Sequence, residues 1–269
     1  MKMFDSHAHY YDERFENNAD EILKKLFADN VGTIINVGTN NENALVCIAQ
    51  AKKYENMYDA VGIHPSDCEA CADIDAEMKK LEELLDNKEE NKTVAIGEIG
   101  LDFHYDGADR DKQREYFVRQ MKIAERRGMP VIIHDRDAHG SSMDVVNMFP
   151  GVSGAFHSFS GSPEMARELV SKGWYISFSG VVTFKNAAKT KRAAAAVPLK
   201  RILVETDCPY LAPHPYRGEL NHSGLMRLTI EELASIHGIS DEEMTRITAE
   251  NASKLFGIPT LRDDSDRLC

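Results

Sequence analysis

Short apolar runs rich in β-branched residues alternate with longer segments of helical pattern along this chain. Several of the runs are continuously apolar, which is typical of strands buried on both faces of a parallel sheet. The predicted strands are Met3–His9, Thr33–Val37, Tyr58–His64, Thr93–Glu98, Val131–His134, Val152–His157, Trp174–Ser179 and Arg201–Asp207. A strand followed by a helix, repeated eight times, predicts the α/β class and a (β/α)8 TIM barrel within it.

The helical segments begin and end at residues that favour helix termini. Ser162 before Pro163 is a typical helix start, and Gly128 stops the segment that begins at Asp111. No linker interrupts the alternation of predicted strands and helices, and a barrel of about 250 residues routinely forms one domain. We therefore predict a single domain over residues 1–258, followed by a polar C-terminal tail over residues 259–269.

The composition is that of a globular protein, with 42% hydrophobic and 28% charged residues, and it excludes a disordered or fibrous chain. No apolar run approaches the roughly 18 residues of a membrane span, and the N-terminus turns polar by Asp5. We therefore expect a cytoplasmic protein that does not bind membranes. The five cysteines are expected to be free thiols there, and the protein is expected to be a monomer.

The net charge of −12 argues against binding nucleic acid through bulk charge, because non-specific DNA-binding proteins usually carry a basic face. A polyanionic substrate would need a local positive centre on this chain. Metal ions or a few well-placed Lys and Arg side chains would supply it.

The strongest local signal is the segment Asp5-Ser6-His7-Ala8-His9 near the N-terminus. Side chains alternate along a strand, so Asp5, His7 and His9 share one face. In a parallel barrel that face is the interior, and the C-terminal end of the strand is the functional rim. The two imidazoles are therefore close enough to bind one cation, although a pair of surface histidines would give the same pattern.

Other predicted strands end in the same kinds of residue. Glu98 ends the fourth strand, His134 the fifth, His157 the sixth and Asp207 the eighth. Unpaired, these groups would be costly at the mouth of an apolar barrel, so we interpret them as a metal site. The predicted ligands are His7, His9, Glu98, His134, His157 and Asp207.

Six ligands are more than one tetrahedral ion with an open position needs. They suit two divalent ions about 4 Å apart that share a carboxylate. The imidazole-rich ligand set favours zinc, manganese or another transition ion over magnesium. The spacing of the ligands does not identify the ion, so zinc, manganese and magnesium all stay open. Two such ions would make a water available as hydroxide near neutral pH, and Asp207 would accept its proton.

As a set, the motifs of this sequence resemble the TatD-type metal-dependent deoxyribonucleases of the amidohydrolase superfamily. The motifs are DSHAH, GEIGLD, the His of the fifth strand, HSFSG, SFSGVVTFKNA and ETDCPYLAP, in order from Phe4 to about Gly257. The resemblance implies a (β/α)8 barrel that hydrolyses phosphodiester bonds at DNA ends. It implies one ion on His7, His9, Glu98 and Asp207, and a second on Glu98, His134 and His157. Glu98 and Asp207 would then be the catalytic residues, with Glu98 bridging the ions.

Five further residues are predicted to bind the substrate. His64 matches a family position near the substrate phosphate, although it also fits a structural role in the loop before Pro65. Arg136, Lys185 and Arg217 lie just past strand ends, where they would contact flanking phosphates or form surface salt bridges. The family commonly has Arg-Gly-x-x-Asn-Glu-Pro after the last strand. Here Arg217, Gly218 and Asn221 match, but His222-Ser223 replaces Glu-Pro.

Two other classes of function remain open. The first is a different hydrolase on the same barrel, such as a deacylase or another ester or amide hydrolase. Many cyclic amidases and phosphotriesterases bridge their metals with a modified lysine at the end of strand four, and Glu98 at that position argues against that branch. The second is a non-catalytic metal-binding protein. A missing ligand would mark it, and all six predicted ligands are present.

Overall fold

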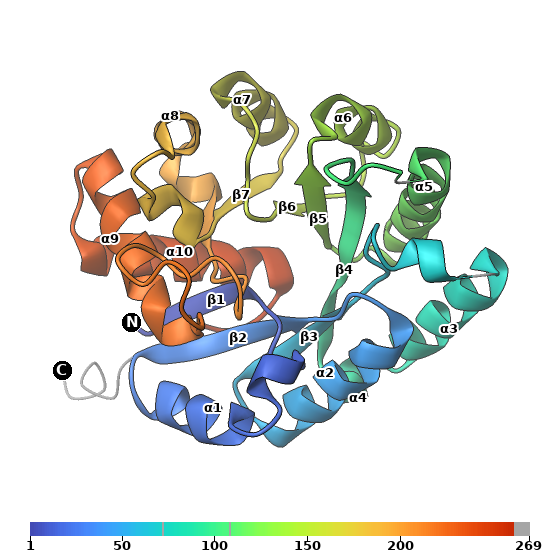
Figure 1. Ribbon diagram of the computed structural model, residues 1–269, viewed down its shortest axis with the longest axis horizontal. Helices are drawn as coiled ribbons and strands as arrows, with labels where there is room; N and C mark the ends of the chain where they lie inside the picture. Colours follow the sequence, from blue (N-terminus) through green and yellow to red (C-terminus); the bar gives the residue numbers. More distant parts are fainter. Residues whose placement is uncertain (72, 108, 261–269) are drawn as a thin grey trace. The chain divides into compact units, whose positions relative to one another are not determined.

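The structure, a computed structural model, describes residues 1–71, 73–107 and 109–260. Within these residues one sheet contains eight strands, in the order β1-β2-β3-β4-β5-β6-β7-β8 (Figure 1). The strands are β1 (Met3–Ala8), β2 (Val31–Val37), β3 (Met57–Val61), β4 (Thr93–Asp102), β5 (Val131–Arg136), β6 (Gly154–Phe156), β7 (Tyr175–Phe178) and β8 (Ile202–Val204).

At least one helix follows every strand. The α-helices are α1 (Ala19–Ala28), α2 (Asn41–Lys53), α3 (Ile74–Asp86), α4 (Lys88–Asn91), α5 (Arg110–Arg127), α6 (His139–Asn147), α7 (Pro163–Ser171), α8 (Ala188–Ala196), α9 (Met226–His237) and α10 (Asp241–Phe256). Short 3-10 helices lie between some of them. This strand order and alternation are those of a (β/α)8 barrel, and the predicted fold class is confirmed. Among the described helices, none is both long and apolar enough to cross a membrane.

The chain divides into two compact units, Met1–Ile35 with Gly161–Cys269, and Asn36–Ser160. The predicted single domain over residues 1–258 stays a prediction. Residues 261–269 of the predicted C-terminal tail lie outside the described residues.

In the unit Asn36–Ser160, the strands β3 to β6 pair in parallel and α5 packs on β4 (Figure 1). The buried side chain of Gln120 on α5 accepts from the backbone N–H of Ile63 at 2.7 Å and donates to its carbonyl at 3.0 Å. These bonds fix the chain just after β3. Gly100 on β4 pairs with His134 on β5, and a Cβ at Gly100 would collide with the His134 carbonyl oxygen. Glycine therefore allows β4 to approach β5 closely there.

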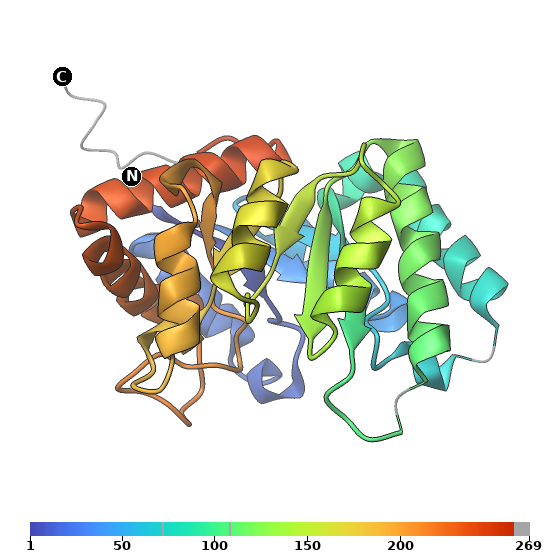
Figure 2. The same cartoon turned by 90° about the horizontal axis from the view of Figure 1, so that it is seen from above.

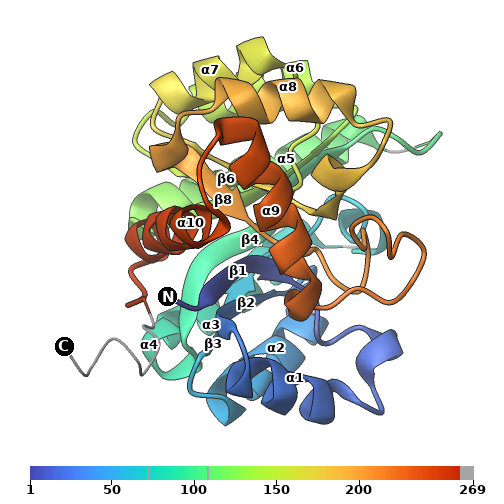
Figure 3. The same ribbon diagram turned by 90° about the vertical axis from the view of Figure 1, so that its left-hand side faces the viewer.

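In the unit that contains both termini, β7 pairs in parallel with β8, and α10 lies against β1 and β8 (Figure 3). Asn251 on α10 donates to the carbonyls of Leu199 and Ile202, each at 2.8 Å, and so ties this helix to the start of β8. Helices α7 and α8 lie side by side (Figure 2).

Seven of the eight predicted strands end at a different residue in the structure, the exception being Thr33–Val37, and the largest shifts are at β3, β4 and β8. β3 ends at Val61 rather than His64. β8 ends at Val204 rather than Asp207, because Asp207 has a φ of 56°, in the left-handed region that a strand does not use. β4 instead runs past Glu98 to Asp102, since it keeps pairing with β5 as far as Arg136. The predicted rim residues therefore lie partly on strands and partly in the turns after them.

Strand β3 carries a buried carboxyl whose ionisation opposes folding. Asp59 is fully buried, and its Oδ2 accepts from the Thr93 hydroxyl at 3.0 Å. Burial raises the pKa of Asp59 to about 7, and the hydrogen bond from Thr93 offsets only part of that rise. The folded state therefore holds this proton more tightly than the unfolded chain. The resulting stabilisation is complete below about pH 4, the usual pKa of an unfolded Asp, and is lost as the pH rises through 7.

We predict that Asp59→Asn removes this pH dependence. Between pH 4 and 8 the free energy of unfolding of the wild type should fall relative to that of the variant by about 2–4 kcal/mol. Urea denaturation at several pH values measures this difference. Asp144→Asn, at an exposed position on α6, is the matched control and should track the wild type. Parallel stability curves for wild type and Asp59→Asn would contradict the prediction.

Candidate metal centre

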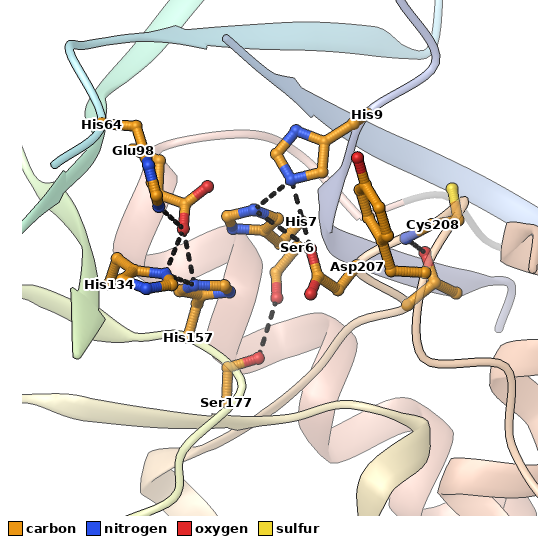
Figure 4. A network of polar contacts seen from close by, with 12 residues as sticks. Ser6, His7, His9, His64, Glu98, His134, His157, Ser177, Asp207 and Cys208 are labelled. Carbon is orange, nitrogen blue, oxygen red and sulfur yellow. Dashed lines mark hydrogen bonds and ion pairs between the residues drawn. The ribbon is translucent and has the colours of Figure 1, made fainter. Parts of the chain in front are cut away.

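In the unit Asn36–Ser160, one carboxylate and three imidazoles gather where the strands end (Figure 4). Glu98 lies on β4, His134 lies on β5, His157 directly follows β6, and His64 lies in the loop after β3. We call these four residues the Glu98 cluster. The side chains of Glu98 and His157 are each 4% exposed, and that of His134 is 16% exposed. The cluster is therefore largely shielded from water.

Three donor atoms of this cluster converge on one another. The Oε1 atom of Glu98 lies 2.7 Å from Nδ1 of His134 and 2.8 Å from Nε2 of His157, and these two nitrogens are 3.1 Å apart. Ligands that surround a zinc-like ion at about 2.0–2.2 Å lie about 3–3.5 Å from one another. The three atoms therefore have nearly the spacing of ligands on a single ion.

The ring of His134 is held by a carboxylate on its far side. Asp102 at the end of β4 places Oδ2 3.1 Å from Nε2 of His134, and the backbone N–H of His104 donates to its Oδ1 at 3.0 Å. Burial would raise the pKa of Asp102, but the hydrogen bonds from His134 and His104 outweigh it and lower that pKa. An ionised carboxylate only accepts, so Nε2 of His134 donates to it.

A proton or a metal ion is therefore needed between His134 and Glu98. With its Nε2 proton directed at Asp102, a neutral His134 turns the lone pair of Nδ1 toward a carboxylate oxygen 2.7 Å away. Either a proton or a metal ion must lie between them. Burial lowers the pKa of His134, but the hydrogen bonds to Asp102 and Glu98 outweigh it and raise the pKa, as expected for a ring that attracts a cation. The donor set of nitrogen and oxygen atoms fits a divalent transition ion.

His64 differs from the other two imidazoles in its proton arrangement. Its Nδ1 accepts from the backbone N–H of Ser66 at 3.1 Å, which leaves the proton of the neutral ring on Nε2. That nitrogen lies 3.6 Å from Oε1 of Glu98. Burial lowers the pKa of His64 to about 3, so the ring is neutral at physiological pH. It therefore presents an N–H donor rather than a lone pair to the cluster.

In the other unit, His7 on β1, His9 just after β1 and Asp207 after β8 form a second cluster, which we call the His7 cluster (Figure 4). The Nε2 atoms of the two histidines are 3.0 Å apart. Asp207 Oδ1 lies 3.2 Å from Nε2 of His9 and 3.8 Å from Nε2 of His7. These three donor atoms also converge as ligands of an ion would.

The backbone of β1 and the turn after β8 fix this second geometry. The N–H of Asp207 donates to the His7 carbonyl at 2.9 Å, and the N–H of His9 donates to the Cys208 carbonyl at 2.8 Å. Deeper on β1, the fully buried carboxylate of Asp5 accepts from the backbone N–H of Thr206 at 3.0 Å and from its hydroxyl at 2.6 Å. Asp5 thus holds the turn that directs Asp207 toward the histidines.

The predicted substrate residues differ in how accessible they are. Arg136, Lys185 and Arg217 are exposed, and the guanidinium of Arg217 lies over the Phe184 ring at 4.6 Å. Asn221 is fully buried, and its amide donates to the carbonyls of Thr206 at 2.9 Å and Tyr210 at 2.7 Å. The structure thus gives Asn221 a role within the loop after β8, while its contact with substrate stays a prediction.

The atypical His222-Ser223 pair also has an internal role. The Ser223 hydroxyl lies 2.8 Å from the Tyr10 hydroxyl, and the Ser223 N–H donates to the Tyr10 oxygen at 3.0 Å, both buried. Nδ1 of His222 accepts from the N–H of Gly224 at 3.1 Å. These contacts position the loop after β8 against the segment that follows β1.

Comparisons with known proteins all point to one family. Residues 4–257 match the model of the family described as TatD related DNase. The chain is 38% identical to the uncharacterized metal-dependent hydrolase YabD of Bacillus subtilis, over 95% of this chain and 99% of that protein. It is 34% identical to the uncharacterized metal-dependent hydrolase YcfH of Escherichia coli, over 99% of this chain and 100% of that protein.

Among solved structures, the chain is similar to the crystal structure of YjjV, a TatD homologue from Escherichia coli. The TM-score is 0.89 at 30% sequence identity, over 96% of this chain and 98% of the other. A match of this quality over nearly the full length of both chains supports the fold class.

We predict that Asp102→Ala weakens metal binding about 10- to 100-fold, because a partner that orients a metal-binding imidazole usually contributes that much. Asp102→Asn keeps an oxygen that can accept from His134, so its metal affinity should lie between those of Asp102→Ala and the wild type. Titration of the metal-free protein with Zn²⁺ or Mn²⁺ measures the affinity. Asp106→Asn, four residues further along and exposed, is the control. An unchanged affinity in Asp102→Ala would show that His134 does not depend on this carboxylate.

Proposed function

Because the chain belongs to the TatD family of metal-dependent hydrolases in the amidohydrolase superfamily, we propose that it hydrolyses phosphodiester bonds of DNA and acts as an exonuclease from strand ends. The observation that carries this proposal is the convergence of donor atoms in both clusters. The name of the matching family, TatD related DNase, supports DNA as the substrate class.

We propose that His134, His157 and Glu98 bind one divalent ion, and that His7, His9 and Asp207 bind another. The bridging role of Glu98 follows from the family resemblance and is part of this proposal. Bound divalent ions supply Lewis-acid stabilisation of a phosphoryl oxygen and lower the pKa of a water molecule. The remaining requirements fall on side chains of this chain: a proton acceptor, a donor to the phosphate and contacts that position the strand.

Asp207 is the proposed proton acceptor. Its side chain is 15% exposed, whereas those of His7 and His9 are 0% and 6% exposed, so it is the most accessible member of its cluster. The hydrogen bond from its N–H to the His7 carbonyl and the bonds from Thr206 to Asp5 limit its movement. A fixed and accessible carboxylate suits transfer of a proton from water to the leaving oxygen.

His64 is the proposed donor to a substrate phosphate oxygen. The neutral ring and the Nε2 proton make it a hydrogen-bond donor at physiological pH, while the Ser66 contacts hold the ring in place. Such a donor stabilises negative charge on a phosphoryl oxygen without competing for a metal ion. Exposed Arg136, Lys185 and Arg217 are the proposed contacts to flanking phosphates.

An acidic chain with few such cations should bind DNA with a weak salt dependence. The formal charge of −12 repels the substrate at long range, so binding depends on the ions and on a small number of cationic side chains. Single-stranded DNA loses about 0.7 units of log affinity per log unit of salt for each phosphate contact. Two to four contacts therefore give a slope of about −1.5 to −3.

We predict that Asp207→Asn lowers the turnover of DNA by at least about 10²- to 10⁴-fold while it keeps the fold, because the variant loses the proton acceptor and weakens a metal ligand. The measurement is release of nucleotides from oligonucleotides labelled at either the 3′ or the 5′ end, at saturating divalent ion. Asp144→Asn is the matched control, since it makes the same change at an exposed residue of α6.

The same assay separates the rival activities. RNA, an aminoacyl ester and a simple carboxylic ester are offered beside DNA under identical conditions. Faster hydrolysis of an ester that is not a phosphodiester would assign the protein to the deacylase class. Activity of Asp207→Asn within tenfold of the wild type on DNA would remove Asp207 from proton transfer.

A further inference from the structure

An exposed aromatic ring lies next to the His7 cluster, and the roles proposed above do not use it. Tyr210 follows Asp207 by three residues in the turn after β8, and 46% of its surface is exposed. Its ring centroid lies 6.4 Å from that of His9. An exposed tyrosine is not unusual in itself, but this ring is accessible to a ligand beside a candidate active site.

The ring of Tyr210 is held rigidly in this exposed position. Its hydroxyl donates to Oδ2 of Asp12 at 3.0 Å, and its backbone carbonyl accepts from Asn221 at 2.7 Å. The guanidinium of Arg14 lies over one face of the ring, with its central carbon 4.1 Å from the ring centroid. These contacts come from the segment after β1 and from the loop after β8, so the ring is fixed before any substrate arrives.

Arg14 itself is poorly suited to bind a phosphate. It donates from Nε to Oδ1 of Asp12 at 2.8 Å and from Nη2 to Oδ2 at 2.9 Å, so its charge is matched by a carboxylate. Burial would raise the pKa of Asp12, but the bonds from Arg14 and Tyr210 outweigh it and lower that pKa. Asp12 therefore stays ionised at neutral pH. What this group offers a ligand is the aromatic surface rather than net positive charge.

We propose that Tyr210 is a stacking platform for a nucleobase at the end of the DNA substrate, a proposal that rests on the function proposed above. Every base has a π-face, so stacking on a fixed aromatic ring gives affinity without regard to sequence. An acidic protein that cannot attract DNA through a basic surface gains most from such a contact. Because the ring lies beside His9, a stacked terminal base would place its own phosphodiester near the His7 cluster.

Tyr105 is the other strongly exposed tyrosine among the described residues, at 62%, and it is less suited to this role. Arg136 lies 5.5 Å from its ring centroid, and the contact between the guanidinium and the hydroxyl is 3.5 Å long. Within the described residues, the Tyr105 hydroxyl contacts Arg136 at 3.5 Å, whereas the Tyr210 hydroxyl donates to a carboxylate at 3.0 Å. Stacking of a base on Tyr105 would lose affinity to the ordering of the ring, whereas the ring of Tyr210 is already ordered.

The test compares Tyr210 variants on substrates with and without the base. We measure kcat/KM for a short single-stranded oligonucleotide and for copies that carry an abasic residue at each of the three terminal positions of either end. Tyr210→Leu should lower kcat/KM on the normal oligonucleotide about 5- to 100-fold, as expected for one lost base stack. In the wild type, kcat/KM for the abasic oligonucleotide should be lower than that for the normal one by a similar factor. In Tyr210→Leu, the two kcat/KM values should differ by no more than about twofold.

Three controls make the outcome decisive. Tyr210→Phe keeps the ring but loses the hydroxyl bond to Asp12 that helps to order it, so its kcat/KM should lie between those of the wild type and Tyr210→Leu. Tyr58→Leu changes a tyrosine at the N-terminal end of β3 that also lies under a cation, Lys92, and should not alter kcat/KM. The metal affinity of Tyr210→Leu should equal that of the wild type.

The inference is overturned if the effects of Tyr210→Leu and of the abasic residue simply multiply, or if Tyr210→Phe is as impaired as Tyr210→Leu. A loss of metal affinity in Tyr210→Leu would also overturn it, since the ring would then act by positioning His9. If the proposed function itself is wrong, the wild type will not degrade the normal oligonucleotide, and this outcome distinguishes that failure from failure of the stacking proposal.

Discussion

One oxygen atom of Glu98 lies within 2.8 Å of two imidazole nitrogens, so a proton or a metal ion is needed among the three atoms. The rest of the Glu98 cluster follows from that constraint. Asp102 binds the outer nitrogen of His134 and turns the inner lone pair toward Glu98. Glycine at position 100 lets β4 come close enough to β5 for both contacts. The His7 cluster has an equivalent support in Asp5, which holds the turn that carries Asp207.

The charge of the chain shapes how such a site can bind a polyanion. Acidic residues outnumber basic ones by 44 to 32. Two exposed arginines near the strand ends, Arg136 and Arg217, lie over aromatic rings. The arginine over Tyr210 is neutralised by Asp12. Affinity for DNA would therefore come from bound ions, a few cations and stacking, and not from a broad electrostatic surface.

The barrel class was predictable, and the six candidate ligands could be proposed from the sequence, because both depend on local patterns. Apolar runs mark the strands, and a His, Glu or Asp just past such a run lies at the C-terminal ends of a parallel sheet. Asp102 was not predicted, because its contact with His134 depends on the register between β4 and β5, and on β4 extending beyond Glu98. The pairing of Tyr210 with Arg14 depends on the backbone bridge between Ala8 and Cys208, far apart in the sequence. The burial of Asn221 was missed because a motif match does not reveal whether a side chain faces substrate or backbone.

The central claim is that hydrolysis by this chain depends on divalent ions held by the two clusters. The most direct measurement follows DNA hydrolysis together with the metal content of the same protein sample during chelation and stepwise return of Zn²⁺ or Mn²⁺. The account predicts that activity disappears with the metal and returns in full only as the content approaches about two ions per chain, as a two-ion site requires. Full hydrolysis of DNA by protein whose metal content is far below one ion per chain would contradict it.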